Sequence, residues 1–152
     1  MCNAFARIAS KYDPAATLEL TFIVAGKRHH TRFFPKFMAD THPAMKKGEI
    51  NGNVKPGLFV DQVITTPGSF NFYLQSHAAI KGTARSAHYH VLEDNFGWQN
   101  GTLDLAELTH ILCYCFGRAT KGVSYVAPAY ISDRLCDRGR VYLKNWTPAR
   151  DY

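Results

Sequence analysis

Four short segments rich in β-branched and aromatic residues constrain the fold most strongly, because each predicts a strand. They span residues 17–25, 58–65, 70–76 and 87–92, and short apolar or alternating runs are typical of strands buried on at least one face. Helices are predicted at 3–12, at 103–116, where apolar residues share one face, and at 128–137, which begins with a proline. This order predicts an α/β or α+β layered domain. Its strands should be partly antiparallel, because several connections are short.

The rest of the sequence predicts one domain with one long connection. The 152 residues are 46% apolar and 20% charged, which is typical of a single globular domain. We find no internal repeat and no linker between folded parts. The polar stretch 35–56 predicts a long surface loop, and Gly117 is expected to end the second helix.

The cysteines predict reduced thiols rather than a disulfide framework, and they are Cys2, Cys113, Cys115 and Cys136. No apolar run is long enough to span a membrane, and the first residues lack the features of a signal peptide. We therefore expect a cytoplasmic protein, with the nucleus as the alternative location, and no membrane partner.

Positive charge is concentrated directly after the first predicted strand. The net charge of +6 attracts polyanions such as RNA, although a mildly basic protein without such a partner has the same balance. The segment Lys27-Arg28-His29-His30-Thr31-Arg32 follows the strand, and α/β sheets place ligands beyond strand ends. Because Arg pairs with phosphate through two N–H groups and Lys supplies a mobile charge, this density favours phosphate binding over a solvated turn.

Two weaker patterns follow further along the chain. Residues 76–85 include His77 and Arg85 and could donate hydrogen bonds to one phosphate, but alone they favour a plain loop. His88 and His90 face one side of a predicted strand and could begin a zinc site. No third ligand follows at a recognised spacing, so packing or surface histidines are favoured over metal ligands.

Polar residues surround the junction between the last two helices, namely Arg118, Lys121, Ser124 and Tyr130. Free N–H groups make a helix N-terminus favourable for anions. Tyr130, Asp133 and Asp137 share one face of the last helix, and a carboxylate such as Asp133 could hold Mg²⁺. On these residues alone, a solvated charged face with intrahelical ion pairs is favoured.

Four stretches together carry a family resemblance. They are TFIVAGKRHHTRFF (21–34), PGLFVDQVITTP (56–67), FYLQSHAAIKGTARSAHYHVL (72–92) and VAPAY (126–130). In this order and spacing they resemble the C-terminal half of the PIWI domain of eukaryotic Argonaute proteins, and a fungal member is expected. The resemblance covers about residues 3–143, so the single domain at 1–152 would be a partial PIWI domain.

The resemblance implies an α/β, RNase H-like PIWI fold that is incomplete, with a mixed sheet and flanking helices. It implies binding of a small guide RNA through its backbone phosphates in RNA-mediated gene silencing. In cleaving members it also implies Mg²⁺-dependent cutting of a paired target RNA. The implied partners are guide RNA, complementary target RNA and silencing-complex proteins, with no small-molecule substrate.

The resemblance also assigns roles to individual residues. It implies guide contacts for Lys27, Arg28, Arg32, His77, Arg85, Arg118, Lys121, Ser124, Tyr130 and Arg138. Phe116 stands where many members have a Tyr that touches the guide, so a phenolic hydrogen bond is absent there. Asp133 aligns with the fourth metal-site residue, which is His in many animal members and Asp in some fungal and prokaryotic ones. Asp suits a carboxylate-rich two-metal site.

The sequence also departs from the family pattern. The family's other metal-site residues, two Asp and a Glu, lie upstream of where this chain begins, and its hydrophobic C-terminus is missing. We expect an open strand edge with exposed apolar surface. One Asp cannot assemble a two-metal site, so we expect Mg²⁺ only in a complete PIWI domain, no cofactor for this chain alone, and no cleavage by it alone.

Two other functions stay open on the sequence. The first is a short non-catalytic protein that binds RNA or an Argonaute partner and acts by competition. The second is a small independent RNase H-like nuclease, which would need three or four converging acids. The candidates for those acids are Asp61, Asp94, Asp133 and Asp137.

Overall fold

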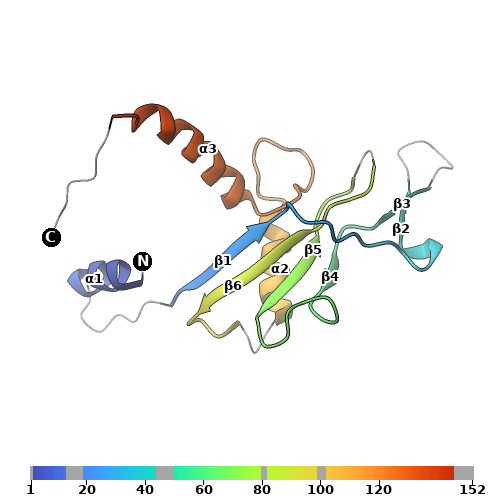
Figure 1. Ribbon diagram of the computed structural model, residues 1–152, viewed down its shortest axis with the longest axis horizontal. Coiled ribbons are helices and arrows are strands. Elements are labelled where there is room, and N and C mark those ends of the chain that lie inside the picture. Colours follow the sequence, from blue (N-terminus) through green and yellow to red (C-terminus); the bar gives the residue numbers. More distant parts are fainter. Residues whose placement is uncertain (1, 13–18, 44–49, 80–81, 99–101, 146–152) are drawn as a thin grey trace.

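The computed structural model describes residues 2–12, 19–43, 50–79, 82–98 and 102–145. Its elements are α1 (Cys2–Tyr12), β1 (Thr21–Gly26), a 3₁₀ helix η1 (Met38–Asp40), β2 (Thr41–Pro43), β3 (Ile50–Val54), β4 (Leu58–Val60), β5 (Asn71–Gln75), β6 (Ala87–Asp94), α2 (Thr102–Leu112) and α3 (Ala127–Tyr142). Figure 1 shows α2 across one face of a four-stranded sheet, while α3 leads away from the sheet. None of the described helices is long and apolar enough to cross a membrane.

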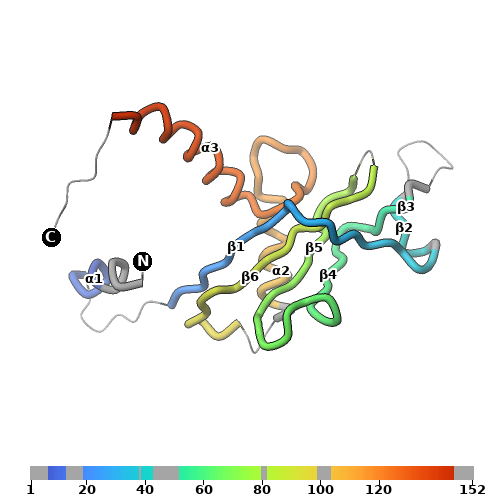
Figure 2. The backbone as a smooth tube through the Cα atoms, viewed as in Figure 1, coloured from blue at the N-terminus to red at the C-terminus, as the bar shows by residue number. Residues whose placement is uncertain are grey.

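The main sheet has the strand order β1-β6-β5-β4, and β2 and β3 form a separate pair. The register places Gly26 opposite His88 and Leu74 opposite Ala87. The segments that follow β1 and β5 therefore leave the sheet at the same end, and Figure 2 shows the chain crossing that end after β1. The sequence predicted a mixed sheet, but every described ladder is antiparallel. The reason is that β4, β5 and β6 are joined by loops without a crossover helix.

Alternation along the strands separates the two faces of the sheet. One face forms the core with α2, and the buried cluster there contains Phe72, Leu74, Ala87, Tyr89, Leu105 and Ala106. The rings of Phe72 and Tyr89 stack with centroids 5.2 Å apart. Aromatic side chains bury the largest areas of any residues, so this pair anchors α2 to the sheet.

The opposite face carries stacked polar rings. The ring of His88 lies flat on Tyr73 with centroids 4.0 Å apart, and its Nε2 lies 3.0 Å from Oδ1 of Asn71. Burial, and then the neighbouring His90 and His29, lower the pKa of His88 to about 4. In the part of the chain that the structure describes, no group of three or more His, Cys, Asp or Glu side chains could hold a metal ion. The stacking on Tyr73 shows that His88 packs on this face of the sheet.

The predicted loop at 35–56 was partly wrong, because it contains η1, β2 and β3. These strands are short and polar, so no apolar alternation marks them. Asn53 is 2% exposed; its Nδ2 donates to the carbonyl of Gly82 at 2.8 Å and its Oδ1 accepts the N–H of Ala84 at 2.7 Å. The hairpin is therefore held by contacts with a distant loop, which no local pattern reports.

Other predicted boundaries also moved. The strand predicted at 58–65 ends at Val60, where the chain turns and Thr65 Oγ1 donates to the carbonyl of Asp61 at 2.7 Å. The second helix ends at Leu112 rather than Phe116, so Gly117 is not its stop. The last helix continues to Tyr142. The first strand starts at Thr21, and residues 17 and 18 of its predicted range lie outside the described residues.

Exposed apolar surface is present on the sheet edge and on α3. Among the described strands β1 pairs only with β6, and Phe22 and Val24 on β1 are exposed. Along α3 only Ala127 is buried, while Ile131 and Leu135 are exposed. Exposed apolar surface, which was expected, is therefore present on β1 and α3, and among the described strands β1 and β4 are the two edges of the main sheet.

Candidate nucleic-acid interface

The candidate site begins at Lys27, the first residue after β1. Its Nζ donates to Oγ of Ser124 at 2.5 Å, and that Oγ lies 2.8 Å from the hydroxyl of Tyr130. Ser124 precedes α3, and Tyr130 lies in the first turn of α3. The fold thus brings a strand end against a helix start, where free N–H groups favour anions.

A hollow of about 360 Å³ opens beside this contact, and it is lined by Lys27, His77, Ala78, Ala79, Thr83, Ala84 and Arg85. Burial, and then the charge of Arg85, lower the pKa of Lys27. Burial, and then the charge of Lys27, lower the pKa of His77. Since positive groups here disfavour one another, a bound anion would stabilise their protonated forms.

Buried hydrogen bonds hold this end of the sheet in place. Gln75 Nε2 donates to the carbonyl of His77 at 2.6 Å, and Ser86 Oγ donates to Oε1 of Gln75 at 2.8 Å. Ser76 Oγ donates to the carbonyl of Val123 at 2.6 Å. Buried polar groups of this kind rigidify a structure only when they are paired. These pairs fix the end of β5 to the segment that leads into α3.

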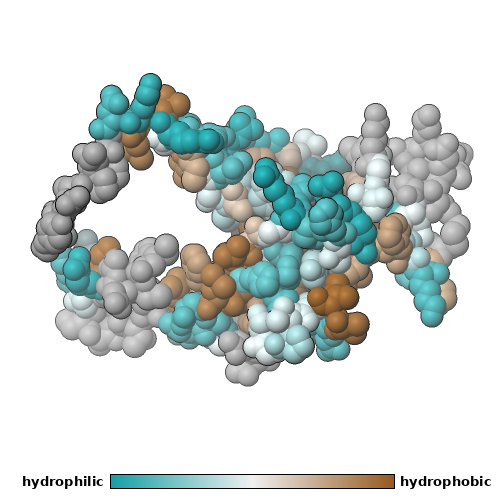
Figure 3. All heavy atoms as spheres, in the orientation of Figure 1, coloured by the Kyte–Doolittle hydropathy of each residue, from teal (hydrophilic) through white to brown (hydrophobic). Residues whose placement is uncertain are grey.

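A second basic hollow of about 170 Å³ is lined by Arg28, His29, His30, Arg32 and Arg85. Arg85 lines both hollows, so the basic surface continues from Lys27 to Arg32. Arg32 Nη1 donates to the carbonyls of His29 and Thr31 at 3.0 and 2.7 Å, which restrains the guanidinium. Figure 3 shows hydrophilic side chains gathered over the end of β1 and the segment after it.

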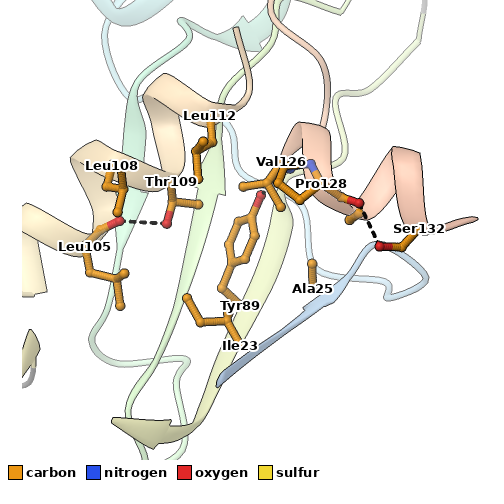
Figure 4. A pocket seen from close by; sticks show the side chains of 11 residues that line it. Ile23, Ala25, Tyr89, Leu105, Leu108, Thr109, Leu112, Val126, Pro128 and Ser132 are labelled. Atoms are coloured by element: carbon orange, nitrogen blue, oxygen red, sulfur yellow. Dashed lines mark hydrogen bonds between the residues drawn. The ribbon is translucent and has the colours of Figure 1, made fainter. Parts of the chain in front are cut away.

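A cavity of about 400 Å³ lies between the sheet, α2 and the start of α3, and most of its lining residues are apolar. Figure 4 shows Leu105 and Leu112 of α2 facing Ile23 of β1 across it, with Tyr89 between them. The hydroxyl of Tyr89 accepts the N–H of Val126 at 3.2 Å, which ties the start of α3 to the sheet. This cavity offers few polar partners for a phosphate, so it supports the site rather than forming part of it.

A model of the Piwi domain matches residues 2–144. The chain belongs to the Piwi family. It is 44% identical over 144 residues to Protein argonaute 5 of Arabidopsis thaliana, covering 95% of this chain and 13% of that protein. It is 42% identical over 140 residues to Protein argonaute 14 of Oryza sativa, covering 92% and 13%. The chain thus spans only a small part of the relatives it matches.

Solved structures agree with this family. The C-terminal lobe of a budding yeast Argonaute has a TM-score of 0.76 and 34% identity, covering 93% of this chain and 28% of that one. Kluyveromyces polysporus Argonaute with a guide RNA has a TM-score of 0.74 and 34% identity, covering 93% and 17%. The predicted α/β, RNase H-like PIWI fold is therefore confirmed.

In this PIWI chain, the predicted guide contacts fall into two groups. The structure brings together Lys27, Arg28, Arg32, His77, Arg85, Ser124 and Tyr130. Arg118 and Lys121 are exposed between α2 and α3, and Arg138 lies farther along α3 with its guanidinium 5.9 Å from the ring of Tyr142. Among the described residues, no hydrogen bond or ring contact joins these last three to the Lys27 hollow. All of these guide contacts stay predictions.

Asp133 is an exposed carboxylate on α3, one turn after Tyr130. Asp137, on the same face, forms a surface ion pair with Arg140. No described group of acids and histidines around Asp133 could hold a metal, and a Mg²⁺ site needs several oxygen ligands. The described residues alone therefore do not fit Mg²⁺. The convergence of Asp61, Asp94, Asp133 and Asp137 that the independent-nuclease alternative requires is not found among them.

The sequence reasoning missed Tyr125 and the stacking role of Phe116. Both rings lie against Tyr130, with centroids 3.9 Å away for Tyr125 and 5.1 Å away for Phe116. The available signal was the aromatic composition of residues 116–130 beside a basic surface. Such interleaving is common at nucleic-acid sites, but only the fold brings residue 116 next to residue 130.

Proposed function

We propose that this chain binds a guide RNA through its backbone phosphates, as part of an Argonaute PIWI domain in RNA-mediated gene silencing. The observation that carries the proposal is the convergence of Lys27, Ser124, Tyr130, His77 and Arg85 at one end of the sheet. A solved Argonaute that contains a guide RNA shares this fold and supports the proposal.

The chemistry of the cluster suits a phosphate rather than a base. Lys and Arg side chains supply charge-assisted donors, and Ser and Tyr hydroxyls supply directed donors. Contacts to phosphate fix the register of a nucleic acid but carry no sequence information. The cluster would therefore hold any guide in one path and leave base pairing to the target RNA.

The test is RNA binding by the purified chain. We expect fluorescently labelled, 5′-phosphorylated single-stranded RNA to bind with an affinity that falls steeply as salt rises. The double variant Lys27→Ala, Arg85→Ala should lose most of that binding. Its matched control is Lys36→Ala, Lys55→Ala, which removes the same charge from a separate hollow beside Phe33 and Phe34. Equal loss in both variants would mean that binding depends on net charge alone, and it would refute the site.

In this proposal, only a complete PIWI domain cleaves the target RNA. In a complete PIWI domain Mg²⁺ would stabilise the charge that develops at the cut phosphate, and Asp133 would be one of its ligands. This chain's own residues would bind and orient the guide. Guide-directed cutting of a complementary target by this chain alone would refute the assignment of cleavage to the complete domain. The competitor alternative keeps the same phosphate contacts and predicts inhibition of a full-length Argonaute when this chain is added in excess.

We also propose a fungal source and a cytoplasmic location. The fungal source rests on Asp133 at the fourth metal-site position and on the similarity to a budding yeast Argonaute, although plant proteins are also up to 44% identical. The location rests on the free thiols of Cys113, Cys115 and Cys136, which suit a reducing compartment. Fractionation of cells that express the tagged chain would test the location.

A further inference from the structure

The ring of Tyr130 is held between two other aromatic rings. Tyr125 stacks on it with centroids 3.9 Å apart and an interplanar angle of 7°, and Phe116 stacks with centroids 5.1 Å apart at 25°. One ring face has room for one stacked partner, so Tyr125 and Phe116 occupy opposite faces. The hydroxyl of Tyr130 lies in the plane of the held ring, so the two neighbours also fix the direction of that hydroxyl.

The hydroxyl of Tyr130 points into the phosphate-binding cluster. It lies 2.8 Å from Oγ of Ser124, which accepts a hydrogen bond from Nζ of Lys27. The same Nζ lies 5.6 Å from the centroid of the Tyr125 ring, within the range of a cation–π contact. Tyr125 therefore touches the cluster twice, once through Tyr130 and once through Lys27.

The Tyr125 hydroxyl, unlike that of Tyr130, does not point to a hydrogen-bond partner among the described residues. Among the described residues it makes no hydrogen bond, while the ring is half-buried and packs at the rim of the core beside Val126. Burial, and then the nearby Tyr130 and Asp133, raise the pKa of Tyr125, so the hydroxyl stays protonated near neutral pH and adds no charge to the cluster. The contribution of Tyr125 is thus the flat face of its ring.

We propose that Tyr125 is a positioning residue for the phosphate-binding cluster, which stacks on Tyr130 and lies under Lys27 so that both donors are aimed at one backbone phosphate. The proposal rests on the proposed function. It differs from the contacts assigned above because Tyr125 acts through Tyr130 and Lys27 rather than by touching the RNA. An aromatic pair contributes enough beyond area burial to change binding by about two- to tenfold.

The main variant is Tyr125→Leu, which keeps apolar volume at the core rim but removes the ring. We expect it to weaken binding of 5′-phosphorylated single-stranded RNA by about three- to tenfold. Tyr125→Phe keeps the stacking face and should bind as the wild type does. The matched control is Phe96→Leu, because Phe96 stacks on Trp98 with centroids 4.7 Å apart at the opposite end of the sheet. That variant should leave RNA binding unchanged.

A double-mutant cycle separates positioning from direct contact. Tyr130→Phe removes the hydroxyl that Tyr125 is proposed to aim. If Tyr125 acts through that hydroxyl, Tyr125→Leu should cost much less binding in the Tyr130→Phe background than in the wild type. The same cycle is made with Lys27→Ala, and additive losses in both cycles would overturn the positioning role, because they would mean that Tyr125 acts independently of both donors.

A measurement without RNA keeps the inference separate from the proposed function. In the wild type, the ring protons of Tyr130 should be shifted in the NMR spectrum by the ring currents of its two neighbours. Tyr125→Leu should move these resonances and Tyr125→Phe should not. If the resonances do not move, the positioning role is refuted. If they move but the wild-type chain shows no salt-dependent RNA binding, the stacking geometry stands and the proposed function fails.

Discussion

Nζ of Lys27 lies 2.5 Å from Oγ of Ser124, although 97 positions separate the two residues in the sequence. Oγ of Ser124 accepts this hydrogen bond and also shares one with the hydroxyl of Tyr130, so one of the two hydroxyl hydrogens stays available for a ligand. Two N–H groups of Lys27 also stay available for a ligand. The contact therefore arranges several donors around one point, which is what a phosphate oxygen requires.

Lys27→Ala should weaken RNA binding by about tenfold, because it removes a charge-assisted hydrogen bond to phosphate. The loss should be the same for RNAs of different sequence, since phosphate contacts carry no base information. The slope of log K against log salt should fall by about 0.7, the value expected for one phosphate contact on a single strand. Fluorescence anisotropy at several salt concentrations measures both quantities.

The control for Lys27 is Lys55→Ala, because Lys55 is also a lysine but lines the separate hollow beside Phe33. It should change affinity and salt slope much less. A loss that depends on RNA sequence would contradict the phosphate role of Lys27.

Much of this cluster could be predicted from sequence, because the residues that carry charge are local to strand ends. The basic segment beginning at Lys27 follows β1 directly, as predicted. Its contact with Ser124 could not be predicted from composition or spacing alone, because it depends on the hydrogen bonds that tie Val123 to Ser76 and Val126 to Tyr89. Only the family resemblance connected these distant segments.

Phe116→Tyr should strengthen RNA binding by about two- to fivefold, because it adds a phenolic donor beside the cluster. The Phe116 ring already stacks on Tyr130 with centroids 5.1 Å apart, so the added hydroxyl would be carried by a ring that lies beside the cluster. Fluorescence anisotropy with the same RNA measures the change. Phe96→Tyr adds the same hydroxyl at the other end of the sheet and should have no effect. Equal gains in both variants would attribute the effect to a general change in surface polarity.

Acid should destabilise the chain between pH 6.5 and about 4 through His88. Its pKa is lowered to about 4 by burial and then by His90 and His29, while the unfolded chain titrates near 6.5. Between these values the unfolded state binds more protons, so stability rises with pH and is lost as pH falls through this window. Urea denaturation at pH 4.5, 5.5 and 6.5 would show the trend.

His88→Phe should flatten that pH dependence, since it keeps a ring to stack on Tyr73 but removes the titrating nitrogen. The variant loses the hydrogen bond to Asn71, so its stability at neutral pH should be lower than that of the wild type. The informative quantity is the slope with pH. An unchanged slope would mean that another titrating group causes the acid sensitivity. His30→Gln, at an exposed histidine, is the matched control.

Asp133→Asn should not change the Mg²⁺ affinity of this chain alone, because one exposed carboxylate lacks the further oxygen ligands that Mg²⁺ requires. Removing the negative charge near Tyr130 should tighten RNA binding by no more than about twofold, as for other exposed charges. Isothermal titration with MgCl₂, followed by RNA binding with and without Mg²⁺, tests both expectations. Specific Mg²⁺ binding by the wild type that disappears in the variant would contradict the first one.

The end of the second helix could not be predicted from the sequence, for a tertiary reason. The apolar face of the second helix continues to Phe116, so its periodicity predicted a longer helix. The chain leaves the helix after Leu112 because the carbonyl of Cys113 accepts the N–H of Val123 at 2.9 Å and the hydroxyl of Tyr114 donates to the carbonyl of Ser76 at 3.0 Å. These contacts turn the chain toward β5 and place Phe116 against Tyr130.

Tyr89→Phe should lower the free energy of unfolding by about 1–2 kcal/mol, because it leaves a partly buried N–H without its acceptor. Tyr89 is 1% exposed, and its hydroxyl accepts the N–H of Val126 at 3.2 Å. Urea denaturation measures this change. Tyr73→Phe is the matched control: Tyr73 is 7% exposed, and among the described residues its hydroxyl has a single, longer contact of 3.5 Å with Oγ1 of Thr31. Tyr73→Phe should therefore lower the free energy of unfolding by less than Tyr89→Phe does.

The same Tyr89→Phe variant tests how the core supports the interface. Val126 follows Ser124 and Tyr125, so releasing its N–H should loosen the segment that carries both of them. RNA affinity should then fall by about two- to threefold at a temperature where the variant is still fully folded. Tyr73→Phe should not reproduce this loss. If Tyr89→Phe lowers stability but leaves RNA affinity unchanged, the cluster is positioned by the stacked rings around Tyr130 and not by the tether to the core.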